Sequence, residues 1–160
     1  TLVDAFAAMA DRAVGLVLVG SGEGQALSIE DELRRRVAER GLGARIAFAG
    51  RQERVEDYLR AADVFAFPSV FEALGIALVE AAACALPAVA SRTGGIVDVV
   101  EDGRSGLLVT PGDAAALSEA LLGLSEDVAL RSRERRKIKA TKSEMFEAFR
   151  AGADNEQLSA

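Results

Sequence analysis

Short apolar runs alternate with amphipathic stretches along most of this chain. The run at 14–19 is continuous and apolar, which is typical of a strand buried on both faces of a parallel sheet. Between the runs, apolar residues recur every three or four positions, as on one face of a helix. The expected strands are 14–19, 45–49, 63–67, 88–91 and 107–109. The expected helices are 2–12, 30–40, 55–62, one that begins near Gly75, 96–101, and one capped by Asp113 that runs to about Leu124.

The alternation of strands and helices predicts an α/β fold with a Rossmann-like, mostly parallel sheet flanked by helices. Residues 1–125 are expected to form this domain, and residues 126–160 a helical extension with a basic run and a polar tail. In a parallel sheet the carboxyl ends of the strands share one edge, where such folds bind ligands. The loops expected to meet at this crevice are those at Gly20, Gly50, Pro68 and Ser91.

The stretch 67–87 carries the strongest functional signal. An apolar strand ends at Pro68, a short loop follows, and a helix begins near Gly75. The first amides of a helix lack intrahelical partners and carry partial positive charge, so this turn offers a seat to an anion. Glu72 precedes the helix, and Glu80 is its only charged residue.

Glu80 is expected to be buried, and a buried carboxylate is costly unless it is hydrogen-bonded. Either a ligand satisfies it, or protein groups do so, such as a backbone amide, Arg51 or Arg92. Glu72 has the same two interpretations, because an acidic residue before a helix also complements the helix dipole.

Composition narrows the class of protein. The chain has 160 residues, of which 50% are hydrophobic, which is enough for one domain with a core. A membrane span needs about 18 consecutive apolar residues, and charged residues interrupt every apolar run before it reaches that length. We therefore expect no membrane span. Cys84 is the single cysteine, and no secretory leader is visible at Thr1. Both observations favour a cytoplasmic location.

The net charge of −6 predicts no nucleic-acid partner. Residues 131–142 carry a net charge of +6, which leaves −12 on the remainder of the chain. The simpler interpretation of this basic run is a solvated helix face; the alternative is contact with an anionic membrane surface or a phosphate-rich partner.

The residue inventory excludes several kinds of chemistry. With no histidine and one cysteine, the chain lacks the means for a Ser-His-Asp triad or a thiolate zinc site, and no metal or other cofactor is expected. The glycines at 20–24 lack the G-x-G-x-x-G spacing, so this segment is interpreted as a loop. Eight residues of helix would separate Glu72 from Glu80 by roughly 12 Å, beyond the range of about 5 to 9.5 Å of paired glycosidase carboxylates. Binding and electrostatic stabilisation of a leaving group remain.

Five motifs in a fixed order give the sequence a family resemblance. They are Phe67-Pro68-Ser69, Glu72 and Glu80 as E-x(7)-E, Ala83-Cys84-Ala85-Leu86-Pro87, Thr93-Gly94-Gly95-Ile96, and the segment Asp102 to Val109. In this order they resemble the donor-binding C-terminal half of the retaining, GT-B-type glycosyltransferases of the group 1 family. The resemblance covers about Val14 to Leu124. It implies half of a GT-B fold and front-face transfer of a hexose from a UDP- or GDP-sugar, with retention of configuration, in polysaccharide biosynthesis.

The resemblance also assigns roles to individual residues. Glu80 matches a glutamate that accepts hydrogen bonds from the donor ribose, and Glu72 matches the catalytic glutamate near the donor sugar. Arg51 and Gln52 match a loop that contacts the base. The amides that match those around the sugar and diphosphate belong to Ala73, Leu74, Gly75 and Ile76.

The chain departs from the family pattern in a few places. Ala85 stands where glycine is usual, and Asp98 where glutamate is common. The resemblance implies that a first strand, whose loop carries diphosphate-binding basic residues, and an N-terminal acceptor domain would precede Thr1, and we expect this chain to lack both. We therefore expect this chain to bind the donor weakly and not to catalyse sugar transfer alone. The glycan or lipid-linked acceptor, and any peripheral membrane contact, are expected to belong to the complete enzyme.

Two other functions stay open. One is a catalytically incomplete binding or structural module of the same fold, paired with another chain. The other is a sugar-nucleotide epimerase-like or dinucleotide-binding domain, which the absence of G-x-G-x-x-G already weakens.

Overall fold

The computed structural model describes residues 1–9, 13–22, 29–127, 129 and 131. Its strands are β1 (Leu16–Val19), β2 (Ile46–Gly50), β3 (Phe65–Phe67), β4 (Ala88–Ser91) and β5 (Gly106–Val109). Its helices are α1 (Leu2–Ala7), α2 (Glu30–Glu39), α3 (Val55–Ala61), α4 (Ile76–Ala83), α5 (Ile96–Val99) and α6 (Ala114–Glu126). Except for Arg131, the predicted basic run and the polar tail lie outside the described residues.

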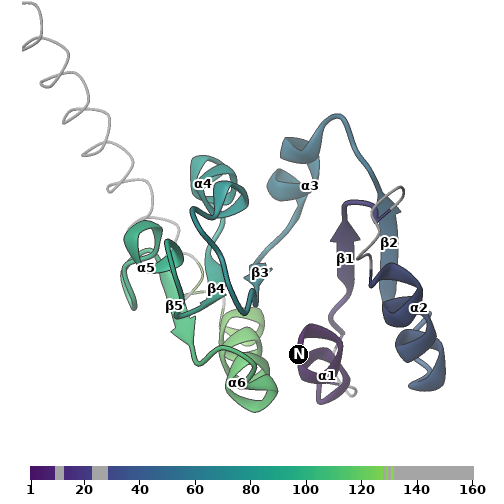
Figure 1. Ribbon diagram of the computed structural model, residues 1–160. Coiled ribbons are helices and arrows are strands. Elements are labelled where there is room, and N and C mark those ends of the chain that lie inside the picture. The colour runs from purple at the N-terminus through teal and green to yellow at the C-terminus, as the bar shows by residue number, and fades with distance from the viewer. Residues whose placement is uncertain (10–12, 23–28, 128, 130, 132–160) are drawn as a thin grey trace, which may run out of the picture.

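The α/β fold with parallel strands flanked by helices is confirmed, but the single expected sheet is divided in two. One sheet pairs β1 with β2, and the other has the order β3-β4-β5; both are parallel. Figure 1 shows the two sheets set apart, with α1 and α6 packed against each other below them. The helix expected at 2–12 ends at Ala7, and the one expected at 96–101 ends at Val99.

Alternation along β4 places the β3-β4-β5 sheet between two helical layers. Val89 packs into the core that contains Leu117 and Leu121 of α6 and Phe6 of α1. Ala88 and Ala90 face the opposite core, which contains side chains of α4 and α5. All four residues of β4 are buried.

Strand β1 is less buried than its sequence predicts. Its residues alternate between half-buried and exposed, and the side chains of Val17 and Val19 are 51% and 38% exposed. The expectation of a strand covered on both faces is therefore wrong for β1. The physical reason is that β1 borders the gap between the two sheets, where no described element covers it.

Helix α4 ends in a turn that ordinarily favours glycine. Leu86 N donates to Ala81 O at 3.0 Å and Ala85 N donates to Ala82 O at 2.9 Å, the pattern of a Schellman motif. Ala85 takes the left-handed position of this motif, with φ of 54°. An L-residue with a Cβ is strained there by roughly 1 kcal/mol.

Ala85→Gly is therefore expected to raise the free energy of unfolding by about 1 kcal/mol, because glycine removes the Cβ strain. Urea denaturation of both proteins measures this difference. Ala82→Gly is the matched control, since it lies in the last turn of α4 with helical geometry and is expected to lower stability by about 1 kcal/mol. A loss of stability in both variants would contradict the strain argument.

Candidate functional site

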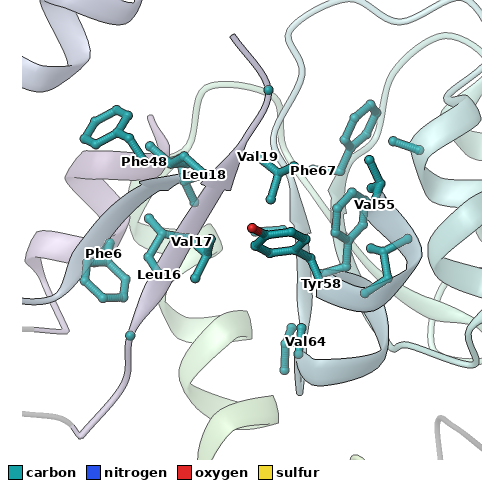
Figure 2. Close-up of a pocket in the computed structure, with 18 of the residues that line it drawn as sticks. Phe6, Leu16, Val17, Leu18, Val19, Phe48, Val55, Tyr58, Val64 and Phe67 are labelled. Carbon is teal, nitrogen blue, oxygen red and sulfur yellow. The ribbon is translucent and has the colours of Figure 1, made fainter. Parts of the chain in front are cut away.

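A groove of about 1050 Å³ opens between β1 and β3. Figure 2 shows its two walls, with Val17 and Val19 on one side and Val64 and Phe67 on the other. Tyr58 of α3 reaches between them, with its hydroxyl pointing into the groove. This placement of Tyr58 could not be predicted from the sequence, since helical spacing identifies only an apolar face.

The carboxyl ends of β1 and β2 place polar groups at the groove. Glu80 of α4, Arg51 and Gln52 line it, together with the loop 20–22. The prediction that distant loops meet at one crevice therefore holds for the loops at Gly20 and Gly50, but Pro68 and Ser91, which were expected at the same crevice, do not line the groove. Gly20 N donates to Gly50 O at 2.9 Å, which ties the two loops together.

Glu80 is exposed, so the expectation of a buried carboxylate is wrong. Helix α4 turns its buried face, with Leu78 and Ala81, to the β3-β4-β5 sheet and leaves Glu80 at the groove. Within the described part of the chain, neither Glu80 nor Arg51 has a hydrogen-bond or ion-pair partner for its side chain. An anionic and a cationic group are thus both available to a ligand.

Two neighbouring groups are already engaged. Gln52 donates its side-chain amide to the carbonyl of Ala49, and Glu30 accepts a hydrogen bond from Gly22 N at 2.9 Å. The second contact anchors the loop 20–22, which the sequence alone did not distinguish from an ordinary connection. Hydrogen bonds from Gly22 and Arg34 hold the pKa of Glu30 below its ordinary value.

Glu72 lies in the loop before α4, so the helical spacing used to separate it from Glu80 does not apply. Gly75 is the N-cap and has φ of 74°, which ends the loop and starts the helix at Ile76. The carboxylate of Glu72 accepts hydrogen bonds from Gly75 N at 3.0 Å and Leu74 N at 3.3 Å. The carboxylate of Glu72 thus already binds two of the backbone amides that were expected to face an anion.

The residues predicted around the diphosphate do not line the groove. Of the residues at the start of α4, Ala77 and Glu80 line the groove, whereas the lining does not include Glu72, Ala73, Leu74, Gly75 or Ile76. Leu74 and Ile76 are 59% and 64% exposed. The predicted site residues therefore form two groups, one within the groove and one at the start of α4.

A pair of glycines supports the loop before α4. A Cβ on Gly94 would lie 1.9 Å from Glu72 O, and one on Gly95 would lie 2.1 Å from Ala73 O. Gly95 N donates to Glu72 O at 3.0 Å, and Thr93 Oγ1 donates to Val70 O at 3.3 Å. The adjacent glycines after β4 were the sequence signal for this close backbone approach.

Arg92 and Asp102 fix the base of this supporting turn. Asp102 accepts a hydrogen bond from Leu108 N at 2.9 Å and pairs with the guanidinium of Arg92. Arg92 N donates to Val109 O at 2.8 Å. Arg92 is therefore the partner of Asp102 and not of Glu80. The Leu108 amide, and then Arg92, hold the pKa of Asp102 below its ordinary value although partial burial opposes them.

This pKa predicts a loss of stability in acid. A carboxylate with a lowered pKa in the folded state stabilises the fold above its unfolded-state pKa, and that contribution disappears as the pH falls through the folded value. We expect the free energy of unfolding to fall below about pH 4, and less steeply in Asp102→Asn. The effect is small because the side chain is 43% exposed. Urea denaturation between about pH 6 and pH 3 measures it. Equal acid slopes in both proteins would contradict the assignment.

Comparison with known proteins identifies the family. The family model "Glycosyl transferases group 1" matches residues 1–127. This chain belongs to the group 1 glycosyltransferase family. Two relatives of this group 1 domain are the lipopolysaccharide core biosynthesis mannosyltransferase LpsB of Rhizobium meliloti (strain 1021) and a D-inositol 3-phosphate glycosyltransferase of Nocardia farcinica (strain IFM 10152). They are 34% and 38% identical over 115 and 118 residues, which are 71% and 72% of this chain.

Solved structures of glycosyltransferases share the arrangement of this group 1 domain. Anabaena HepE, determined in complex with UDP-glucose, is 30% identical and superposes with a TM-score of 0.83 over 89% of this chain and 39% of its own. The C-terminal domain of LpcC from Francisella tularensis, at 23% identity, has the same fold, with a TM-score of 0.76 over 85% of this chain and 72% of its own.

The group 1 domain spans only part of its relatives. It covers 33% of the length of LpsB and 26% of the Nocardia farcinica protein. Among the described helices, none has both the length and the apolar character needed to cross a bilayer.

Proposed function

We propose that this chain is the donor-binding half of a retaining glycosyltransferase that transfers a hexose from a UDP-sugar, or alternatively a GDP-sugar, to a glycan or lipid acceptor. The observation that carries the proposal is that Glu80 and Arg51, whose side chains have no partner among the residues that the structure describes, line one groove of a group 1 domain. The likeness to HepE, which was determined with UDP-glucose and with UDP, favours uridine over guanosine as the base.

Glu80 and Arg51 suit the two ends of a nucleoside. A carboxylate accepts hydrogen bonds from two adjacent hydroxyl groups, as a ribose presents them. Arg51 follows Gly50 at the end of β2 and brings a guanidinium to the lining of the same groove, which suits a base or a phosphate. Both side chains are exposed and are therefore accessible to a ligand.

The amides at the start of α4 suit the negative end of the donor. In this structure the Glu72 carboxylate takes the position of an anion on Leu74 N and Gly75 N. A diphosphate or sugar oxygen would replace that carboxylate, since two negative groups repel each other at such a distance. Glu72 would then turn toward the donor sugar, where a carboxylate stabilises positive charge that develops during transfer.

A panel of nucleotides tests the proposal. Thermal-shift and calorimetric titrations with UDP, GDP, ADP and NAD are expected to show stabilisation by UDP above the others, because a ligand that binds only the folded state raises its melting temperature. EDTA is expected to leave the UDP shift unchanged, since metal independence is part of the proposal. If no nucleotide stabilises the protein, the donor-binding assignment fails; a preference for NAD would favour the dinucleotide-binding alternative.

A binding module without chemistry is the second candidate. The observation in its favour is that Glu72 is already engaged by the helix amides. Addition of the separately expressed N-terminal half of a group 1 relative distinguishes the two. Sugar transfer on addition supports the enzyme, whereas UDP binding without transfer supports the module. The cytoplasmic location remains a prediction from the sequence.

A further inference from the structure

The side of α3 that faces the groove carries an aromatic ring with a polar tip. Tyr58 lies in the middle of α3 and is half-buried. Figure 2 shows its ring between the two walls of the groove, with the hydroxyl pointing into the space between them. In the part of the chain that the structure describes, this hydroxyl has no hydrogen-bond partner. Because a half-buried tyrosine hydroxyl usually has a partner, the group is available to a ligand in the groove.

Packing between α3 and α4 brings Tyr58 and Glu80 to the same groove. Leu59 of α3 and Ala81 of α4 belong to one buried cluster, and the two helices are in contact. The residues directly before them, Tyr58 and Glu80, line the groove. The loop 51–54, which leads into α3, reaches the same groove through its first two residues. A ligand held by Glu80 therefore lies next to the helix that carries the tyrosine.

The walls on either side of this hydroxyl are apolar. Val17 and Val19 of β1 line one side and Val64 lines the other, as Figure 2 shows. The side chains of Val17 and Val19 are 51% and 38% exposed, so they are open to contact. A phosphate is poorly placed between such walls, because a charge in apolar surroundings is costly. A nucleobase combines flat apolar faces with an edge of hydrogen-bond donors and acceptors, which matches the valines and the hydroxyl together.

We propose that the Tyr58 hydroxyl forms a hydrogen bond with the edge of the donor's base, while the valines of the two walls contact the faces of the base. This assignment rests on the proposed function, in which Glu80 holds the ribose. The base is joined directly to that ribose, and α3 packs beside α4, so the base lies within reach of α3. The hydroxyl suits both polar atoms of the uracil edge, because it donates to a carbonyl and accepts from an N–H.

Calorimetry with UDP on the parent chain and two variants tests the assignment. Tyr58→Phe is expected to weaken UDP binding by about three- to tenfold. Its melting temperature without ligand is expected to stay unchanged, because the hydroxyl has no partner among the described residues. Ser125→Ala is the matched control. It removes another hydroxyl from the lining, one that already donates to Leu122 O at 3.0 Å, and is expected to bind UDP as the parent does.

The part of the nucleotide that meets Tyr58 is identified with ribose 5-phosphate, which lacks the base. Its affinity is expected to be equal for the parent and for Tyr58→Phe. Tyr58 is the single tyrosine of the chain, which has no tryptophan, so tyrosine fluorescence reports on this residue alone. UDP is expected to lower the emission with the Kd that calorimetry gives, whereas ribose 5-phosphate is not. N-acetyltyrosinamide, titrated in parallel, corrects for light absorbed by uracil.

The outcomes separate this assignment from the proposed function. If the parent binds UDP and Tyr58→Phe binds it equally well, or if saturating UDP leaves the emission unchanged, the assignment of Tyr58 is overturned and the donor site stands. An equal loss of affinity for UDP and for ribose 5-phosphate also overturns it, since the hydroxyl would then contact ribose or phosphate. So does a lower melting temperature of Tyr58→Phe without ligand, which would give the hydroxyl a structural role. A parent chain that does not bind UDP overturns the proposed function and the assignment together.

Discussion

Gly95→Ala is expected to lower the free energy of unfolding by about 1 to 3 kcal/mol and to weaken nucleotide binding by tenfold or more. The added Cβ would lie 2.1 Å from the carbonyl oxygen of Ala73, a distance at which the backbone has to move. Gly95 itself has φ of −69°, so alanine is acceptable at this backbone geometry and the whole effect comes from the contact. The displaced segment carries Glu72 and the amides at the start of α4.

Gly123→Ala is the matched control. Gly123 lies within α6, has no atom within 4 Å of a Cβ, and has no positive φ. Alanine there is expected to raise stability by about 0.5 to 1 kcal/mol and to leave nucleotide affinity unchanged. Urea denaturation and calorimetry with UDP measure both variants. A Gly95→Ala protein as stable as the parent would show that the turn at 93–95 yields easily and does not position the loop before α4.

Glu80→Ala is expected to weaken UDP binding by roughly 10- to 100-fold without loss of stability. Loss of one hydrogen bond to a charged acceptor corresponds to about 1.5 to 3 kcal/mol of binding free energy. Stability is preserved because the side chain is exposed, has no partner in the described part of the chain, and is replaced by the best helix former. Calorimetry measures the affinity, and thermal unfolding without ligand measures the stability.

Glu119→Ala on the exposed side of α6 controls for the change in net charge. Its affinity for UDP is expected to match that of the parent, because it lies outside the groove. If Glu80→Ala binds UDP as tightly as this control, Glu80 does not contact the ribose. The groove would then need another recognition group, for which Arg51 is the next candidate.

The order and type of the elements could be predicted from the sequence alone. Three local signals carried this prediction: the uninterrupted apolar run at β4, Gly75 before α4, and the N-cap Asp113 of α6. Asp113 accepts a hydrogen bond from Ala116 N at 2.9 Å. Each signal acts within a few residues of the position that it affects. The sequence also predicted that the loops of Gly20 and Gly50 would meet, because parallel pairing alone brings strand ends to one edge.

Tertiary packing decided the rest. Sequence context placed Glu80 among apolar neighbours and predicted burial, but the rotation of α4 on its sheet, fixed by Leu78 and Ala81, directs Glu80 to the groove. The division of the sheet between β1 and β3 could not be predicted from the local sequence pattern either, because the exposure of Val17 depends on whether a neighbouring strand is present. Local sequence determines which elements form, whereas the free energy of contacts between distant elements determines which faces they cover.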